Sequence, residues 1–136
     1  MAEHPQKARP LSPFLTVYRW PVTMATSIIH RMTGVALAGG TLLIAWWLLA
    51  VASGPETFNF INSTIATLPG QVVLYGFAWS LAYHFFNGIR HLAWDFGYGF
   101  AVPTANKTGI VVFALSLILT AGIFLAVHFG YAGYYR

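Results

Sequence analysis

The sequence predicts an all-α membrane protein with three transmembrane helices, organised as a single membrane-anchor domain over residues 1–136. Of the 136 residues, 57% are hydrophobic and only 7% are charged, whereas a soluble domain carries about 25% charged residues. Three apolar segments lie at about 22–53, 69–92 and 108–131, and each is long enough to cross a bilayer, which requires about 20 residues. Polar residues and turn formers separate these segments.

Residues 1–20 form a polar, proline-containing segment that ends in the aromatic and basic cluster Tyr18-Arg19-Trp20. Such clusters are typical of the headgroup layer, so we expect this segment to lie at the membrane interface. It has neither the apolar core and cleavage site of a secretory signal nor the amphipathic, Arg- and Ser-rich character of an organelle presequence. We therefore expect the bacterial inner (cytoplasmic) membrane as the location, in preference to the mitochondrial inner membrane.

The first span follows Pro21, a residue that suits the first turn of a helix. No charged residue occurs between Arg31 and Glu56. The helix is therefore expected to begin shortly after Pro21 and to carry Ser27, His30 and Arg31 in its first turns.

Turn-forming residues flank the second span and predict a loop on each side of it. The segment 53–68 opens with Ser53-Gly54-Pro55-Glu56 and contains further Asn, Ser and Thr residues. The segment 93–107 contains an aspartate, two glycines, Pro103 and Lys107. The third span has no charged residue and ends in a tyrosine-rich segment, which is typical of an interface anchor.

The basic residues predict the orientation in the membrane. Three spans place the two termini on opposite sides. Four basic residues lie in the N-terminal segment or the first turns of the first span, and Arg90 and Lys107 lie at the end of the second span and in the loop that follows it. The first loop has no Lys or Arg, and the C-terminus has only Arg136. Because Lys and Arg are enriched on the cytoplasmic side, the N-terminus is expected to be cytoplasmic. The segments 27–31 and 84–95 should therefore lie near the same inner surface.

A stripe of polar residues occupies the end of the second span. At 100° per residue, His84, Gly88, His91 and Asp95 fall within about 60° of one another on a helix. A histidine within a span is costly without a partner and indicates a functional site by default. With Gly88 one turn further on, His84 has the form of a haem ligand beside space for a flat macrocycle. The alternative is a histidine bonded to a carbonyl of a neighbouring helix.

The other histidines do not supply an obvious second haem ligand. His30 is expected at the interface beside Arg31, and His128 lies in the third span near the opposite surface. If the haem has two imidazole ligands, the second ligand is one of these histidines or a histidine of a partner protein. A ligand from a partner protein is at least as good an explanation.

Ser27 and Arg31 are four residues apart and share a helix face with Gly34. A hydroxyl and a guanidinium entering an apolar cavity suit a carbonyl-bearing ligand such as a quinone, and Arg31 could instead pair with a haem propionate. The competing interpretation is a snorkelling arginine and a serine bonded to its own helix. Arg90 is similarly open, and Asp95 is expected to pair with Arg90 or His91 rather than to transfer protons.

Several classes of function are excluded. Cysteine is absent from the sequence, which excludes disulfides, cysteine-ligated zinc and iron–sulfur clusters in this chain. No phosphate-binding glycine loop is present, so flavin or nicotinamide chemistry would have to come from another subunit. The net charge is +4 without a basic run, so the excess indicates orientation in membrane lipid rather than binding to nucleic acid.

Two groups of residues match known motifs in the right order. The first comprises Arg9-Pro10-Leu11-Ser12-Pro13, Tyr18-Arg19-Trp20-Pro21 and Ser27-Ile28-Ile29-His30-Arg31-Met32-Thr33-Gly34. The second is the pattern His84-x3-Gly88-x-Arg90-His91-x3-Asp95. Together they resemble the two signatures of the succinate dehydrogenase cytochrome b556 subunits, a family of membrane anchors of succinate:quinone oxidoreductase (complex II). The resemblance covers nearly the whole chain.

The resemblance implies half of a heterodimeric, haem-binding helix bundle. In this family the chain pairs with a second hydrophobic anchor subunit, and the two hold a flavoprotein and an iron–sulfur protein on the inner face. Electrons from succinate pass through flavin and iron–sulfur clusters to ubiquinone. The chain itself would not oxidise succinate, but it would contribute to the quinone site of the enzyme.

The resemblance also implies roles for individual residues. His84 matches the axial ligand of the haem b iron, and the partner anchor subunit supplies the other ligand. Ser27 and Arg31 match quinone-site residues, and His30 and Arg31 match positions near the haem propionates. Gly88 would leave space for the ring. Supporting positions at the inner end of the second span are Arg90, His91 and Asp95.

Three alternatives remain beside this interpretation. An anchor of a quinol:fumarate reductase has the same architecture and runs the reaction in the other direction. A structural anchor without haem is disfavoured by the presence of His84 and Gly88. A small transporter or channel protein would need a polar path through several helices, whereas the first and third spans are nearly free of ionisable groups apart from His128.

Overall fold

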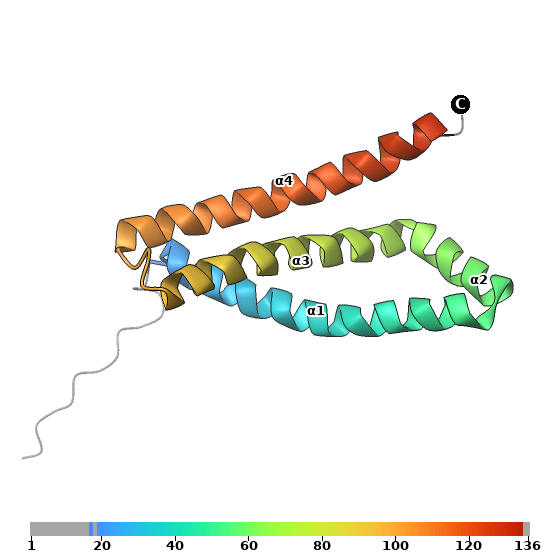
Figure 1. The fold of residues 1–136 in the computed structure, drawn as a ribbon, viewed down its shortest axis with the longest axis horizontal. Helices are drawn as coiled ribbons and strands as arrows, with labels where there is room; N and C mark the ends of the chain where they lie inside the picture. The colour runs from blue at the N-terminus through green and yellow to red at the C-terminus, as the bar shows by residue number, and fades with distance from the viewer. Residues whose placement is uncertain (1–16, 18, 135–136) are drawn as a thin grey trace, which may run out of the picture.

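The computed structural model describes residue 17 and residues 19–134, with side chains up to residue 130, and this part of the chain is helical without a strand. Four helices follow one another (Figure 1): α1 (Val22–Ser53), α2 (Pro55–Ala66), α3 (Leu68–Asp95) and α4 (Val102–Tyr134). The interfacial segment predicted for residues 1–20 falls mostly outside the described residues.

Helix α3 lies between α1 and α4 and contacts both of them. The start of α1, the end of α3 and the start of α4 gather at one end of the molecule, whereas α2 and the C-terminal end of α4 lie at the other end (Figure 1). This topology brings the segments 27–31 and 84–95 to the same end of the molecule, as the sequence predicted.

Two of the helices, α1 and α4, are by themselves long and apolar enough to cross a membrane, with mean hydropathies of 2.1 and 2.8. Helix α3 is long and apolar enough only when it is taken together with α2, and the two helices are bent by 83° relative to each other. The described residues therefore contain two candidate spans, or up to three if the bent pair forms one span. Polar residues lower the hydropathy of α3. They include Gln71, Ser80, His84 and Asn87.

The segment expected as a polar loop over residues 53–68 is mostly helix α2, so this prediction was wrong. Gly54, at a φ of 106°, ends α1 and allows the chain to turn, and Pro55 occupies the first turn of α2, where its missing N–H has no cost. Phe58, Ile61 and Ile65 recur at helical spacing, and Ile61 is only 1% exposed. The buried face of α2 therefore outweighs the turn-forming tendency of its polar residues.

The second predicted loop, over residues 93–107, is shorter in the structure. Helix α3 continues to Asp95 and α4 already begins at Val102, six residues before the expected start of the third span at 108. Pro103 lies in the first turn of α4, a position that tolerates proline. Of the residues that suggested a loop, Pro103 and Lys107 lie in the first turns of α4 and Asp95 ends α3, so only Gly97 and Gly99 lie in the connection itself.

Burial is arranged as expected for a membrane helix bundle. Large apolar side chains on α1 and α4, such as Leu42 at 72% and Ile118 at 67%, are exposed. Buried positions between the helices are often small or polar instead. The buried polar and charged side chains are Thr26, Thr33, Ser80, Asn87, Arg90 and Ser116. Most of them lie toward the end of the molecule where α1 and α4 begin and α3 ends.

Candidate functional site

Three histidines from two helices meet at this end of the bundle. The rings of His30 on α1 and His84 on α3 are stacked, with centroids 3.9 Å apart and planes inclined by 12°. The ring of His91, two turns after His84, lies 5.1 Å from that of His30. The structure therefore joins the two segments that carry the candidate residues.

The ring of His84 is held from several sides. Its Nδ1 lies 3.2 Å from the backbone oxygen of His30 and 3.3 Å from Oγ1 of Thr33. A Cβ added at Gly34 would lie 3.2 Å from Cε1 of His84, so only glycine lets the two helices approach this closely without displacing the ring. His84 is thus fixed by α1, and the alternative interpretation of a carbonyl-bonded histidine is correct for its Nδ1.

Gly88, one turn after His84, has open space beside it. No atom lies within 4 Å of a Cβ built at this glycine, apart from its own local backbone. The α3 surface next to His84 is therefore not filled by the rest of the described chain, and a flat group or a partner helix can approach it.

Ser27 and Arg31 are both exposed on the first turns of α1. His30, between them in sequence, is only partly exposed, and its Nδ1 is buried without a hydrogen-bond partner in the described part of the chain. The hydroxyl and the guanidinium are therefore presented on the outside of this chain, beside the histidine cluster, and a closed site around them needs a further surface.

Arg90 is buried between three helices, with 6% of its surface exposed. It donates to Oγ1 of Thr108 at 3.0 Å, to the carbonyl of Ala105 at 2.8 Å and to Oγ1 of Thr26 at 3.3 Å. Within α3 it donates to Oδ1 of Asn87 at 3.2 Å. These contacts join α3 to both α1 and α4.

The expected pairing of Arg90 with Asp95 is not formed. Residues five apart on a helix point about 140° away from each other, and here Arg90 points into the bundle while Asp95 is exposed. The guanidinium instead lies 4.2 Å from the ring centroid of Trp94. His91 also meets the Trp94 ring, edge to face at 5.0 Å, rather than an acidic side chain.

Sequence reasoning missed three polar residues that organise this end of the bundle. The hydroxyl of Tyr83 donates to the carbonyl of Thr26 at 3.1 Å, and Thr33 contacts His84. Thr26 and Thr33 are seven residues apart, two turns of helix, and both are almost fully buried, at 4% and 2% exposed. The seven-residue spacing between the two threonines, which places them on one face of the helix, was the available signal.

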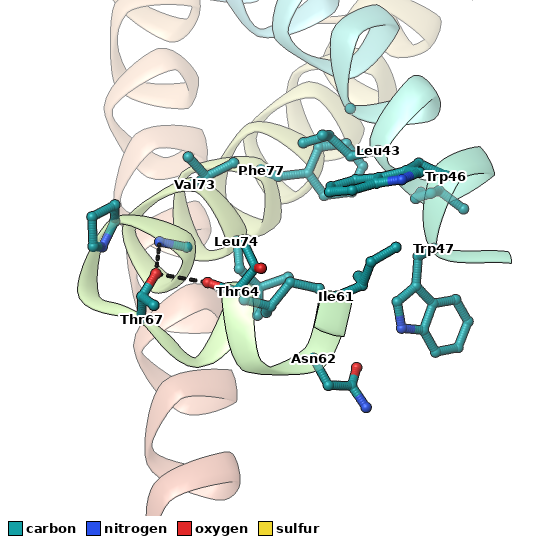
Figure 2. Close-up of a pocket in the computed structure, with 15 residues that line it drawn as sticks. Leu43, Trp46, Trp47, Ile61, Asn62, Thr64, Thr67, Val73, Leu74 and Phe77 are labelled. Atoms are coloured by element: carbon teal, nitrogen blue, oxygen red, sulfur yellow. Dashed lines mark hydrogen bonds between the residues drawn. The ribbon is translucent and has the colours of Figure 1, made fainter. Parts of the chain in front are cut away.

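A cavity of about 570 Å³ lies at the opposite end, between α1, α2 and the start of α3 (Figure 2). Its wall is mainly apolar, with Leu43, Trp46, Ile61 and Phe77 among the lining side chains. None of the candidate site residues lines it. The candidate site residues are therefore separate from this cavity.

Comparison with known proteins gives consistent results. A sequence model of the family described as "Succinate dehydrogenase/Fumarate reductase transmembrane subunit" matches residues 5–123. The chain is 41% identical to the succinate dehydrogenase cytochrome b556 subunit of Paracoccus denitrificans over 119 residues, which cover 88% of this chain and 92% of the relative. It is 42% identical to the cytochrome b556 subunit of Rickettsia felis, over 82% of this chain and 87% of the relative.

A mitochondrial protein is also similar. The succinate dehydrogenase cytochrome b560 subunit of Sus scrofa is 38% identical over 117 residues, which cover 85% of this chain and 69% of the relative.

Proposed function

Because the chain belongs to the succinate dehydrogenase/fumarate reductase transmembrane subunit family, it is a membrane-anchor subunit of the cytochrome b type, and we propose that it binds haem b and contributes to a ubiquinone site. Its enzyme partners are the flavoprotein and iron–sulfur subunits of a succinate dehydrogenase. The chain provides the membrane end of the electron path, and succinate is oxidised elsewhere in the complex.

The surroundings of His84 suit an axial haem ligand, and this is the observation that carries the proposal. An imidazole that ligates iron commonly donates its other N–H to a backbone carbonyl or a carboxylate. Nδ1 of His84 lies 3.2 Å from the carbonyl oxygen of His30, so Nε2 is left with its lone pair for a metal. Open space beside Gly88 suits the edge of a macrocycle. The haem would supply one-electron redox chemistry at this position.

The other ligand of the haem iron would come from the partner anchor subunit. His30 is the histidine nearest to His84, but the two rings are stacked at 3.9 Å, which leaves no room for a macrocycle between them. His30 instead has a buried Nδ1 without a hydrogen-bond partner among the described side chains. The ring of His30 is partly exposed and directly precedes Arg31 in the sequence, so it suits a position beside a haem propionate, with Arg31 as the charged partner.

Ser27 and Arg31 bind the quinone. Both side chains are exposed on α1 close to the histidine cluster, and a hydroxyl with a guanidinium can hold a quinone carbonyl and stabilise negative charge that develops on its oxygen. The iron–sulfur protein closes this site from the inner side of the membrane. His91 and Asp95 have supporting roles at the same end of α3.

The topology that suits this function has three spans formed by α1, by the α2–α3 pair and by α4. The N-terminus then faces the cytoplasm and the whole chain, residues 1–136, forms one anchor domain. This arrangement places the candidate residues at the inner surface, where the soluble subunits dock. We propose the bacterial inner membrane as the location, where the second anchor subunit and this chain together form a heterodimeric bundle.

An anchor of a quinol:fumarate reductase is the second candidate, because the matching family includes fumarate reductase subunits. The relatives described above are all succinate dehydrogenase subunits, which favours succinate oxidation. The direction can be measured with the purified complex, as the ratio of succinate:quinone to quinol:fumarate turnover.

A reduced-minus-oxidised absorption spectrum of the purified complex tests the haem proposal. We expect sharp b-type bands in the wild type and their loss or displacement in His84→Ala. His128→Ala is the matched control, since His128 lies on α4 in contact with Tyr75 (Nδ1 to the Tyr75 hydroxyl, 3.2 Å), and its spectrum should equal that of the wild type. A wild-type complex without these bands would support a structural anchor instead.

A further inference from the structure

Thr33 is a buried residue beside His84 to which the proposed function assigns no role. Its hydroxyl is 2.9 Å from the carbonyl oxygen of His30, three residues earlier in the same helix, and it donates its single proton to this oxygen. The Thr33 oxygen then has only lone pairs left to offer. It lies 3.3 Å from Nδ1 of His84, and the His30 carbonyl lies 3.2 Å from the same nitrogen.

These two contacts determine the tautomer of the ring. Both oxygens that face Nδ1 of His84 are acceptors, because the Thr33 proton is used and a carbonyl has none to give. A bare Nδ1 lone pair would be repelled by both, whereas an Nδ1–H can donate to them. The proton of the neutral imidazole is therefore held on Nδ1, and the lone pair is on Nε2.

The position of the ring is also restricted. The His30 ring covers one face of His84 at 3.9 Å, and Gly34 lies against Cε1. Thr33 is only 2% exposed, so water does not compete freely for its hydroxyl. The His84–Thr33 contact joins residues 51 apart in sequence and links α3 to α1.

We propose that Thr33 is a positioning residue that, together with the His30 carbonyl, fixes the tautomer of His84 and that adds to its electron-donating strength. This inference rests on the proposed role of His84 as an axial ligand. A ligand imidazole is more basic when its N–H is bonded to an acceptor, and a more basic ligand favours oxidised iron. Loss of the Thr33 oxygen weakens this effect and shifts the haem midpoint potential to more positive values.

The experiment compares three variants of the full complex. Thr33→Val keeps the shape but removes the hydroxyl, whereas Thr33→Ser keeps it. Thr41→Val is the matched control, because Thr41 makes the same type of bond to a carbonyl three residues earlier, Ala38, at an exposed site on the same helix. Potentiometric titration gives the haem midpoint potential, and electron paramagnetic resonance gives the g-values of the oxidised haem.

We expect Thr33→Val to stabilise reduced over oxidised haem several-fold, where a tenfold change corresponds to about 59 mV for one electron. The g-values should change, and the affinity for haem should fall by about 10-fold or more, as for other changes in groups that orient a metal ligand. Thr33→Ser and Thr41→Val should match the wild type in midpoint potential, g-values and affinity for haem.

The outcomes separate this inference from the proposed function. A wild-type complex without haem bands that depend on His84 would overturn the proposed function. Bands that depend on His84, with Thr33→Val equal to Thr41→Val in potential and g-values, would overturn only the inference about Thr33. If Thr33→Val does not assemble, Thr33→Ala is measured in its place. If neither Thr33→Val nor Thr33→Ala assembles while Thr33→Ser does, the hydroxyl is required for folding alone, and this result would contradict the proposed effect of Thr33 on the haem potential.

Discussion

The guanidinium of Arg90 on α3 donates a hydrogen bond to the hydroxyl of Thr26 on α1, 3.3 Å away. The same side chain reaches α4 through Thr108 and the carbonyl of Ala105. A charge with 6% exposure is stable here because acceptors from three helices surround it. Arg90 therefore connects the helices that carry the candidate site, and it is not a snorkelling side chain at the membrane boundary.

Replacement of Arg90 by methionine should destabilise the subunit. The variant loses the bonds to Thr26, Thr108 and Ala105, and because hydrogen bonds between helices in a membrane contribute about 0.6 kcal/mol each on average, we expect a loss of about 2 kcal/mol. Unfolding of the complex in increasing dodecyl sulfate, followed by circular dichroism, measures this change. Arg19→Met, at an exposed position, is the control, and an Arg90→Met variant as stable as this control would contradict the structural role.

Replacement of Arg31 or Ser27 should weaken quinone reduction. A hydrogen bond from a charged group contributes about 1.5–3 kcal/mol and a neutral one about 1 kcal/mol, so kcat/KM for ubiquinone should fall about 10- to 100-fold in Arg31→Gln and about 5-fold in Ser27→Ala. Steady-state kinetics with varied ubiquinone, at saturating succinate, give these values.

The control for this pair lies on the same helix. Ser53 is exposed at the far end of α1, where its hydroxyl donates to the carbonyl of Leu49, and Ser53→Ala should keep the wild-type kcat/KM. Equal kinetics for Ser27→Ala, Arg31→Gln and Ser53→Ala would remove the quinone assignment and leave Arg31 as a snorkelling residue.

Gly34→Ala should disturb His84. The added methyl group would lie 3.2 Å from Cε1 of His84, and the ring cannot move away easily because His30 covers its face. Overpacking of this kind costs about 1–3 kcal/mol, so we expect weaker haem retention and altered g-values. Gly39→Ala is the control, since no atom lies within 4 Å of a Cβ at that position. Haem content per protein that is equal in the two variants would show that the helices separate to accommodate the methyl group.

Helical periodicity and topology predicted where the histidines meet. The spacing of His84 and His91 placed them on one helix face, and the order of the spans placed the segments 27–31 and 84–95 near one another. The structure brings these segments to the same end, and the ring of His30 contacts both histidines of α3. This works because long apolar helices have a fixed angular repeat and few ways to pack. The roles of these residues in binding haem and quinone stay predictions.

The features that the sequence did not predict depend on contacts between distant residues. The contact of Thr33 with His84 could not be predicted, because the two residues lie 51 positions apart in the sequence. Arg90 was open between several roles until α1 and α4 supplied its acceptors. Helix α2 was predicted as a loop because its polar residues and Pro55 resemble a turn, and only the burial of Ile61 against other helices shows why it is helical.

The corner between α2 and α3 gives a prediction that is independent of the haem site. The helices are bent by 83° at this corner, where Thr67 donates to the carbonyl of Thr64 at 2.6 Å and accepts from the amide of Gly70 at 3.3 Å (Figure 2). A Cβ at Gly70 would collide with the carbonyl oxygens of Thr64 and Ile65. These are backbone atoms, so no rotamer change relieves the contact.

Gly70→Ala should therefore open the corner and destabilise the subunit by about 1–3 kcal/mol, as overpacking does elsewhere. The haem potential should stay at the wild-type value, because Gly70 and His84 are separated by about four turns of α3, roughly 21 Å. Gly76→Ala is the matched control on the same helix, since a Cβ there meets no atom within 4 Å. Denaturation in dodecyl sulfate and potentiometry on both variants separate the two effects. A shifted potential in Gly70→Ala, or a stability equal to that of Gly76→Ala, would show that the corner is not a rigid element isolated from the histidine cluster.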